Sequence, residues 1–150
     1  MPTVEVSRVE PMGREEIARV QARHLLWLTS DRKQGERADF SYKNLSGADL
    51  HGMRWDKAIF RCANLCNANF AKAHLTKANF NSAKLSNAIF RKAFLYDAKF
   101  QYALLSNVDF TGANLVFADV RHAKMNGCKF AYADSLGWKT DENQGRELER

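Results

Sequence analysis

The stretch FAKAHLTKANFNSAKLSNAIF, residues 70–90, has a large apolar residue at positions 70, 75, 80, 85 and 90. An alanine stands two positions before each of the last four. A spacing of five suits neither regular element, because five residues turn an α-helix by about 500° and an odd spacing alternates between the faces of a strand. Positions i−2 and i do share one face of a strand, so Ala78 and Phe80 can both point inward if the chain then turns a corner. The period therefore predicts a short extended segment and a corner, repeated.

The same register extends well beyond this stretch. Large centres recur every five residues between positions 40 and 130, which makes 19 units without a slip. Alanine stands two positions before the centre in every unit but four, and the exceptions are Lys43, Met53, Val108 and Cys128. Self-similarity at a fixed short period indicates a solenoid, in which successive turns stack into one continuous core.

The identity of the centres favours four sides in each coil. Between positions 60 and 115 the centres alternate strictly between Phe and Leu, which is a second period of ten residues. With four sides, positions 20 apart stack, and every column contains only Phe or only Leu. Three sides would stack positions 15 apart and mix the two types. The predicted core lining is Phe60, Leu65, Phe70, Leu75, Phe80, Leu85, Phe90, Leu95, Phe100, Leu105, Phe110 and Leu115.

The quintets ADLHG (48–52), ANLCN (63–67) and ANLVF (113–117) follow the pattern A(D/N)LXX. This pattern resembles that of pentapeptide-repeat proteins, and the resemblance covers residues 38–130. The segment HLLWLTSDRKQGERADF, residues 24–40, also resembles the sequence that often leads into such repeats. The resemblance implies an all-β solenoid, a right-handed quadrilateral parallel β-helix with four five-residue sides in each coil.

Both ends of such a coil need a cover, because apolar side chains and unpaired backbone groups would otherwise face water. Residues 13–28 predict a short N-terminal capping α-helix, with an acidic first turn and the side chains Ile17, Val20, His24 and Trp27 at helical spacing. We expect Leu136 and Trp138 to close the other end. The predicted organisation is an N-terminal tail (1–12), the helical cap with its connecting segment (13–37), the β-helix (38–133), and a C-terminal cap and mobile tail (134–150).

The length and composition indicate a soluble protein with one domain, and the family resemblance implies one of bacterial type. Hydrophobic residues make up 45% of the 150 residues, but charges interrupt the N-terminal segment 1–30. No segment approaches the roughly 20 apolar residues that span a bilayer, and no signal peptide is predicted. The three cysteines, Cys62, Cys66 and Cys128, are odd in number and lack the spacing of a disulfide framework. We expect free thiols, no membrane segment and a cytoplasmic location.

Catalysis needs polar groups that converge, whereas the outward positions of this coil are spread over flat walls. No phosphate-binding loop, nucleophile elbow or zinc-protease motif occurs. His51, His74 and His122 fall on different sides of the coil, and His24 falls in the cap, so their positions predict no metal site. We expect no catalytic residue, no metal, no cofactor and no small-molecule substrate.

The coil is basic. Residues 38–130 contain 13 Lys and Arg against 6 Asp and Glu, a net charge of +7. A candidate basic patch lies on the side of Trp55 and Leu75 and on the adjoining side, and it consists of Arg54, Lys57, Lys72, Lys77, Arg91 and Lys92. The simpler interpretation is a solvated surface; the alternative is a patch that binds an acidic protein or a nucleic acid. Aromatic platforms for unpaired bases are missing around it, which disfavours nucleic acid.

A second feature lies further along the side of Trp55. Tyr96 and Val116 occupy equivalent positions, 20 apart, and should stack on consecutive coils, with Phe94 and Phe117 beside them. A cluster of outward apolar residues is a candidate protein interface, for self-association as a homodimer or for another protein.

Three functions follow from these features. The first is a non-catalytic scaffold that acts by protein–protein interaction through its walls. The second is implied by the resemblance, because the pentapeptide-repeat family includes quinolone-resistance proteins that mimic DNA and bind type II topoisomerases such as DNA gyrase. The net charge of +7 on residues 38–130 disfavours DNA mimicry, because duplex DNA is strongly negative. The third is direct nucleic-acid binding through the basic patch.

Overall fold

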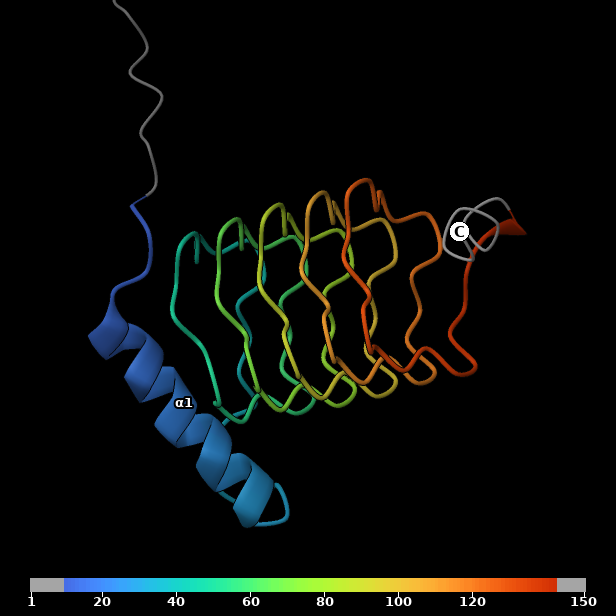
Figure 1. The fold of residues 1–150 in the computed structure, drawn as a ribbon. Helices are drawn as coiled ribbons and strands as arrows, with labels where there is room; N and C mark the ends of the chain where they lie inside the picture. Colours follow the sequence, from blue (N-terminus) through green and yellow to red (C-terminus); the bar gives the residue numbers. More distant parts are fainter. Residues whose placement is uncertain (1–9, 143–150) are drawn as a thin grey trace, which may run out of the picture.

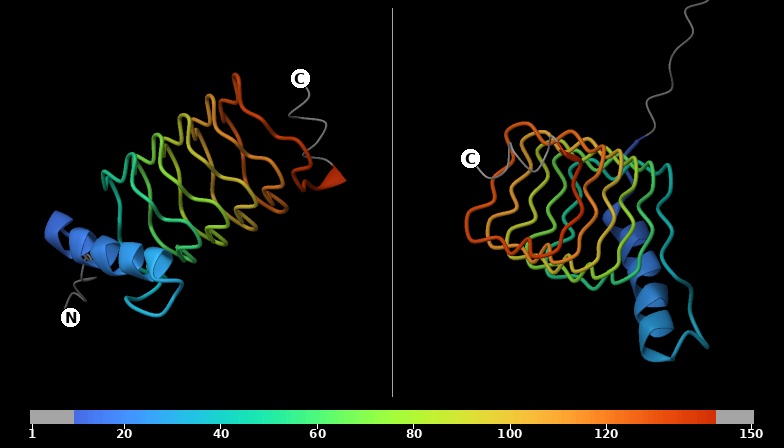
Figure 2. Two further views of the ribbon diagram at one scale, coloured as in Figure 1. Left: turned by 90° about the horizontal axis from the view of Figure 1, so that it is seen from below. Right: turned by 90° about the vertical axis from the view of Figure 1, so that its right-hand side faces the viewer.

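The computed structural model describes residues 10–142; residues 1–9 and 143–150, which include most of both predicted tails, lie outside the described residues. Helix α1 (Arg14–Thr29) precedes a coil in which isolated parallel bridges each join a residue to the one 20 positions later. The bridges begin at Asp39 and end at Lys139. Figure 1 shows the coils stacked along one axis, and their outlines overlap in the end-on view of Figure 2. This pairing of i with i+20 confirms four five-residue sides in each coil.

The coil has four walls, which we number by their centres in chain order. Wall 1 contains Phe40, Phe60, Phe80, Phe100 and Val120; wall 2 contains Leu45, Leu65, Leu85, Leu105 and Met125; wall 3 contains Leu50, Phe70, Phe90, Phe110 and Phe130; wall 4 contains Trp55, Leu75, Leu95, Leu115 and Ser135. In each wall the residue before the centre points outward and forms the bridge, and the two residues after the centre form the corner.

Each corner is a turn that a backbone hydrogen bond closes. After Phe80, the Ala83 N–H donates to the Phe80 carbonyl oxygen at 3.0 Å, and Ser82 has a φ of 61°. A positive φ at the third residue of the turn alone is typical of a type II turn. This left-handed residue recurs at every fifth position between residues 42 and 137. The period of five is therefore a bridge segment plus a type II turn.

The Asp or Asn of the A(D/N)LXX pattern has a role at these corners. Its side chain accepts a hydrogen bond from the backbone N–H two residues later, as Asn79 does from Asn81 and Asn114 does from Val116, both at 3.0 Å. Such side chains satisfy a backbone donor that the bridges leave unpaired. The preference for Asp and Asn before the centre therefore follows from the hydrogen bonding of the corner.

The core consists of columns of like residues. The Phe60 and Phe80 rings stack at 4.8 Å with an angle of 4°, and Phe70 meets Phe80 edge-on at 5.6 Å and 87°. Every residue of the predicted lining is fully buried. The two Phe columns thus face each other across the interior and the Leu columns fill the other two walls, so the prediction of pure columns is confirmed.

Helix α1 lies across the N-terminal end of the coil (Figure 1). It buries Ile17 and His24 against the first coil, and its first turn carries the predicted acidic residues Glu15 and Glu16. The returning loop approaches the helix closely at Gly35, where an added Cβ would lie 2.2 Å from the Arg23 carbonyl oxygen. With a φ of 75° as well, Gly35 is a position that only glycine fits.

His24 is a packed residue and not part of an open site. Its ring lies between the rings of Trp27 and Trp55, at centroid distances of 5.6 and 5.7 Å. Nδ1 accepts the Ala38 N–H at 3.0 Å, so Nε2 carries the proton and donates to the Asp56 carbonyl oxygen at 3.0 Å. Both ring nitrogens are satisfied when the imidazole is neutral.

The C-terminal end of the coil differs from the expectation. Bridges continue to Asp134 and Lys139, so the last two quintets extend the coil where a separate cap was expected from residue 134. Trp138 packs edge-on against Phe130 at 5.6 Å, whereas Leu136 is 70% exposed. Leu136 therefore does not close the core, because it follows a centre and occupies an outward corner position.

Candidate protein-binding wall

The outward residues of wall 4 form two columns. The bridge column consists of residues that pair with one another through parallel bridges on successive coils: Arg54, His74, Phe94, Asn114 and Asp134. The corner column contains Asp56, Lys57, Thr76, Lys77, Tyr96, Asp97, Val116, Phe117, Leu136 and Gly137. Because successive coils are about 4.8 Å apart, each residue lies directly beside its equivalent on the next coil.

Within each column, aromatic rings contact one another on adjacent coils. The His74 and Phe94 rings stack at 4.7 Å, and the Tyr96 and Phe117 rings meet edge-on at 5.5 Å. The Phe117 ring also covers Gly137, where an added Cβ would lie 2.5 Å from the ring. These contacts hold the aromatic rings in fixed positions on the outside of the coil.

These side chains remain accessible to a partner. Phe94 is 46% exposed, Tyr96 is 38% exposed and Phe117 is 44% exposed, while Val116 is half-buried beside them. The structure adds Leu136, which occupies the position of Val116 on the next coil and was expected at the end of the core. We call Phe94, Tyr96, Val116, Phe117 and Leu136 the wall 4 cluster. Continuing the register of five past residue 130 would have placed Leu136 in it.

The candidate basic patch divides between the two edges of wall 4. Lys57 and Lys77 lie at the corner that joins wall 4 to wall 1, whereas Lys72, Arg91 and Lys92 lie at the corner that joins wall 3 to wall 4. Arg54 lies between the two edges. Five of the six cations therefore line the two edges of the wall, and the six do not form one corner.

Two of these cations already have acidic partners. Arg54 lies 3.6 Å from the Asp56 carboxylate, and Arg91 forms an ion pair with Asp109. Burial alone would raise the pKa of Asp109, but hydrogen bonds from Thr111 and Arg91 outweigh it and lower the pKa to about 2. Arg91 is thus neutralised locally, which weakens the patch as a binding site for nucleic acid.

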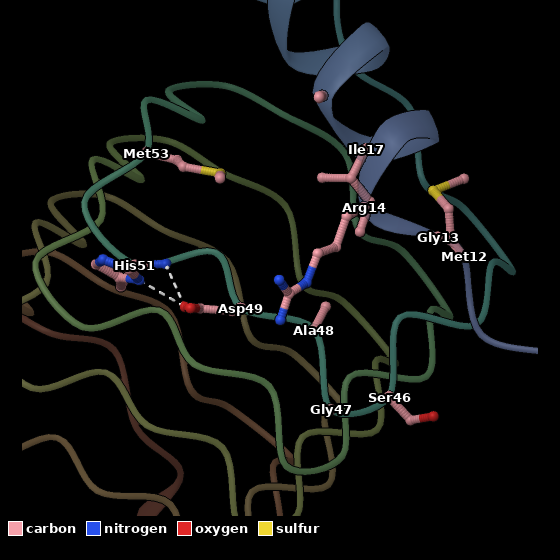
Figure 3. Close-up of a pocket in the computed structure, with 11 residues that line it drawn as sticks. Met12, Gly13, Arg14, Ile17, Ser46, Gly47, Ala48, Asp49, His51 and Met53 are labelled. Atoms are coloured by element: carbon pink, nitrogen blue, oxygen red, sulfur yellow. Dashed lines mark hydrogen bonds and ion pairs between the residues drawn. The ribbon is translucent and has the colours of Figure 1, made fainter.

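A groove of about 440 Å³ separates the start of α1 from the first coil (Figure 3). Met12, Ile17 and other apolar side chains line it, and Arg14 extends from the helix towards the coil. Asp49 and His51 lie on the coil side and bond each other at 2.6 Å, and this hydrogen bond lowers the pKa of Asp49. The groove is a packing gap beneath the helix, and the Asp49 and His51 side chains that reach it are already paired.

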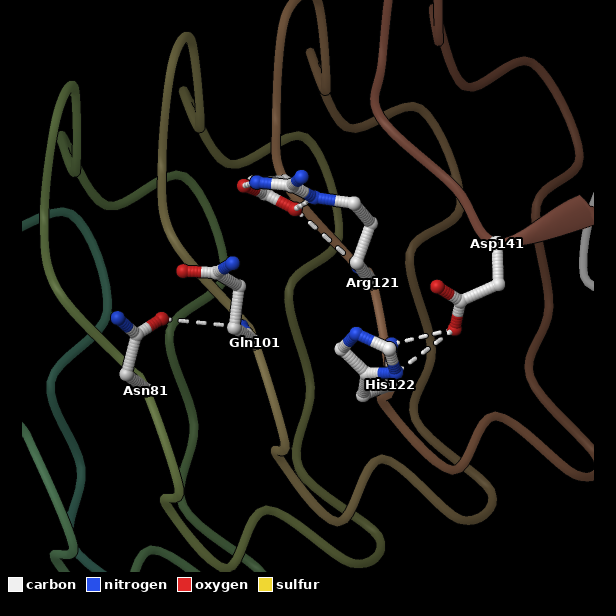
Figure 4. Close-up of polar contacts among 6 residues, drawn as sticks. Asn81, Gln101, Arg121, His122 and Asp141 are labelled. Carbon is white, nitrogen blue, oxygen red and sulfur yellow. Dashed lines mark hydrogen bonds and ion pairs between the residues drawn. The ribbon is translucent and has the colours of Figure 1, made fainter.

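Polar side chains also form a row on wall 1 (Figure 4). Asn81 accepts the Gln101 N–H at 2.9 Å, Arg121 pairs with Asp119 at 2.8 Å, and the His122 N–H donates to Asp141 at 2.6 Å. Each group bonds a neighbour on its own or the next coil. These contacts stabilise the wall and its corners.

The remaining candidates for chemistry stay apart. Within residues 10–142, no group of three His, Cys, Asp or Glu side chains is arranged to hold a metal ion. The same residues include no helix long and apolar enough to cross a bilayer. The absence of catalysis stays a prediction from the spread of polar groups over four walls.

The three thiols are free and differ in their surroundings. The Cys128 Sγ donates to the Leu105 carbonyl oxygen at 2.8 Å, and burial raises the pKa of this thiol to about 11. Cys62 and Cys66 lie at two different corners and are half-buried. We expect iodoacetamide at pH 8 to alkylate Cys62 at least about tenfold faster than Cys128, because the thiolate is the nucleophile. Peptide mass spectrometry over time measures both rates, and equal rates would contradict the burial of Cys128.

Comparison with known proteins identifies the repeat. The sequence matches the family model of pentapeptide repeats, with 8 copies, at residues 58–95 and 95–130. No curated protein is similar enough in sequence to count as a match. Among solved structures, a pentapeptide repeat protein from the thylakoid lumen of Arabidopsis thaliana is 30% identical, with 75% of each chain covered and a TM-score of 0.61.

Two further structures share less with this chain. The pentapeptide repeat protein Rfr23 from the cyanobacterium Cyanothece 51142 is 23% identical, with 75% of this chain and 66% of that chain covered and a TM-score of 0.43. QnrB1, a plasmid-mediated fluoroquinolone resistance protein, is 19% identical, with 74% of this chain and 63% of that chain covered and a TM-score of 0.45. The repeat match, the similarity to the Arabidopsis protein and the bridges between positions i and i+20 agree. This chain belongs to the pentapeptide-repeat family.

Proposed function

We propose that this protein is a non-catalytic scaffold that binds a protein partner through the wall 4 cluster. One observation carries the proposal: apolar side chains on adjacent coils, three of them aromatic and more than a third exposed, gather on one wall. Exposed apolar patches on soluble proteins mark contact surfaces, and aromatic anchors dominate the binding energy of interfaces. Because the coil and the ring contacts already fix these side chains, binding would cost little conformational entropy.

Finer features of the fold are part of the same proposal. We infer a right-handed coil, as the family resemblance implies, and a capping role for α1, which the burial of Ile17 and His24 supports. The free thiols favour a reducing compartment such as the cytoplasm. The divided basic patch and the pairing of Arg91 leave nucleic-acid binding without a specific supporting observation.

DNA mimicry is not part of the proposal. A protein that takes the place of duplex DNA needs a negative surface, because the duplex carries one charge about every 1.7 Å of its axis. Residues 38–130 carry a net charge of +7. The sign of the charge therefore opposes binding in a positively charged DNA channel.

A capture experiment with a matched control tests the proposal. We expect Phe94→Asp combined with Phe117→Asp to abolish the retention of partner proteins, because two carboxylates in the centre of an apolar contact would be desolvated on binding. The control is Tyr42→Asp combined with Tyr102→Asp, which alters two exposed aromatic residues at the corner between walls 1 and 2. Quantitative mass spectrometry of proteins retained from the source cell by the tagged chain compares both variants with the wild type. The same retained proteins for all three would overturn the proposal.

A further inference from the structure

Wall 4 carries opposite charges at its two ends. Towards the N-terminal end it contains Lys57 and Lys77, and neither forms an ion pair within residues 10–142, whereas Arg54 and Asp56 face each other. On the last described coil the wall carries Asp134, whereas Asp97 lies on the middle coil, next to Tyr96. Phe94, Tyr96, Val116 and Phe117 lie on the two coils between Lys77 and Asp134. A surface that is basic at one end and acidic at the other is complementary to a second copy of itself that is turned end to end.

The regular coil allows this complementarity to be followed residue by residue. When two copies meet face to face and antiparallel, their twofold axis lies in the plane of contact and is perpendicular to the direction in which the coils stack. Such an axis reverses the order of the coils and keeps each column opposite itself. If the axis passes midway between the coils of Phe94 and Asn114, it exchanges those two coils. It also exchanges the coil of His74 with the coil of Asp134, because the bridges place the coils at even intervals.

We propose that the occupant of wall 4 is a second copy of this chain, docked antiparallel about this axis. The arrangement places Tyr96 against Val116 of the partner subunit. It places His74 against Asp134 of the partner subunit, with Lys77 in the adjacent column of the same coil. The symmetry makes each contact twice. The inference rests on the proposed function, since it names the partner for the same cluster.

The side chains at the ends are suited to these contacts. Asp134 is exposed and uses Oδ1 to accept the Leu136 N–H at 3.1 Å, which fixes the carboxylate and leaves Oδ2 available. The His74 ring is exposed and held by its stacking on Phe94, so it can donate an N–H across the contact. Lys77 is exposed, and its backbone N–H donates to the Tyr96 carbonyl oxygen at 2.8 Å. A fixed carboxylate therefore meets a fixed ring and a long, flexible ammonium without rearrangement of either backbone.

This register also avoids contacts between like charges. It sets Asp97 opposite Phe117 of the partner subunit and Lys92 opposite Gly112 of the partner subunit. An axis through the coil of Phe94 would instead set Asp97 and Lys92 opposite their own equivalents, which repel. An axis through the coil of Asn114 would set Asp134 opposite Phe94 of the partner subunit and leave His74 and Lys77 without a carboxylate opposite them.

Other occupants fit the wall less well. A parallel dimer would bring each coil level with its own equivalent, so that the two basic ends would meet and repel. A uniformly acidic partner would suit only the end with Lys57 and Lys77, and a uniformly basic partner would suit only the end with Asp134. The reversed wall itself pairs His74 and Lys77 with Asp134 and sets Tyr96 against Val116 in the centre.

The size of the wall sets the strength of the contact. Four coils overlap in this register, so the contact is about 19 Å long at about 4.8 Å for each coil. It is a few residues wide, which is small beside the roughly 800 Å² that each partner buries in a standard interface. We therefore expect a weak dimer, with a Kd of about 10–500 μM. Sedimentation velocity over a concentration range that reaches about 1 mM covers this regime.

Charge exchange distinguishes the antiparallel dimer from other contacts. We expect His74→Asp alone and Asp134→Lys alone each to raise the Kd about tenfold, because each replaces two attractions by two repulsions. The double variant restores opposite charges with the positions exchanged, so its Kd should return to within about threefold of the wild type. Lys84→Glu, an exposed position on the opposite wall 2, is the matched control and should leave the Kd unchanged.

The outcomes separate this inference from the proposed function. Single variants without effect, or a double variant that does not recover, would overturn the antiparallel arrangement. A wild type that stays monomeric throughout the concentration range, or a dimer that persists with Phe94→Asp and Phe117→Asp, would overturn the second copy as occupant. In the capture comparison a tagged chain retains the untagged chain if the dimer forms. Retention of other proteins only, lost with the two Asp substitutions, would leave the proposed function standing without this inference.

Discussion

Replacing Phe80 by alanine will lower the free energy of unfolding by about 3–5 kcal/mol, the range seen when a fully buried phenylalanine is truncated. Phe80 is completely buried in the middle of its column. Its ring stacks on Phe60 at 4.8 Å and on Phe100 at 5.0 Å, and it meets Phe70 edge-on at 5.6 Å. Truncation removes the transfer free energy of the ring and leaves a cavity that the rigid ladders on both sides cannot close.

The position of Phe80 makes the effect large. In a solenoid each turn contacts only its neighbours, so a weak coil in the middle separates the two halves of the stack. The backbone at this point is held by short bonds on both sides, such as that from the Phe80 N–H to the Lys99 carbonyl oxygen at 2.7 Å. The walls therefore cannot collapse inward to fill the space of the missing ring.

Urea denaturation followed by far-ultraviolet circular dichroism measures the loss as a lower midpoint. Tyr132→Ala is the control, because this aromatic side chain is 95% exposed and its removal should change the stability by less than about 0.5 kcal/mol. Equal midpoints for the two variants would contradict the assignment of the Phe columns as the stabilising core.

The fold could be predicted from sequence because its rules are local and repeat. Phe80, Ala83 and Asn79 show the three requirements of one quintet: a large centre, a small residue in the tight space after the corner, and a side chain that accepts the corner N–H. Any one quintet is weak as a signal. Nineteen in one register leave only the number of sides open, and the alternation of Phe and Leu decides that number.

The prediction failed at the C-terminal end, where the backbone pattern of the coil continues beyond the last large apolar centre. Ser135 is a centre without a large side chain, so the apolar period ends before it. The coil nevertheless continues, because backbone bonds such as that from the Leu115 N–H to the Asp134 carbonyl oxygen at 2.6 Å do not depend on the size of the centre. Leu136 was consequently expected in the interior, although it lies at an outward corner.

The positions of the candidate site residues could be predicted from the sequence, but the contacts between their side chains could not. Counting by 20 places Phe94, Tyr96 and Phe117 near one another, but the choice of rotamer decides which rings touch. The pair of Arg91 and Asp109 depends in the same way on a side chain reaching from a corner to the next coil. Sequence periodicity fixes the backbone position of each residue, whereas these pairings require atomic positions.

Lowering the pH below about 6.5 will destabilise the protein through His24, by up to about 1.4 kcal/mol for each pH unit. Burial lowers the pKa of His24 below its ordinary 6.5; the hydrogen bond to the Asp56 carbonyl and the Asp56 charge act against this, and the positive charges of Arg37 and Arg54 add to it. The unfolded chain thus binds a proton at a higher pH than the folded chain does. Stability from the neutral imidazole is full above a pH of about 6.5 and is lost as the pH falls.

The contacts of His24 explain why protonation is unfavourable. Nδ1 accepts the Ala38 N–H at 3.0 Å, and a proton on Nδ1 would set two donors against each other. The ring would also be charged while it lies between Trp27 and Trp55, out of contact with water. Protonation therefore opposes the packing of α1 on the first coil, and acid should loosen the N-terminal end before the middle of the stack.

The variant His24→Gln separates titration from packing. A glutamine side chain can accept from the Ala38 N–H and donate to the Asp56 carbonyl oxygen, but it does not titrate. We expect urea midpoints of this variant to stay level between pH 6.5 and 5 relative to the falling midpoints of the wild type. His74→Gln, at an exposed position, should follow the wild type, and the exposed His51 and His122 are common to all three proteins. If His24→Gln loses stability in acid as steeply as the wild type, another group is responsible and the buried imidazole does not control the attachment of α1.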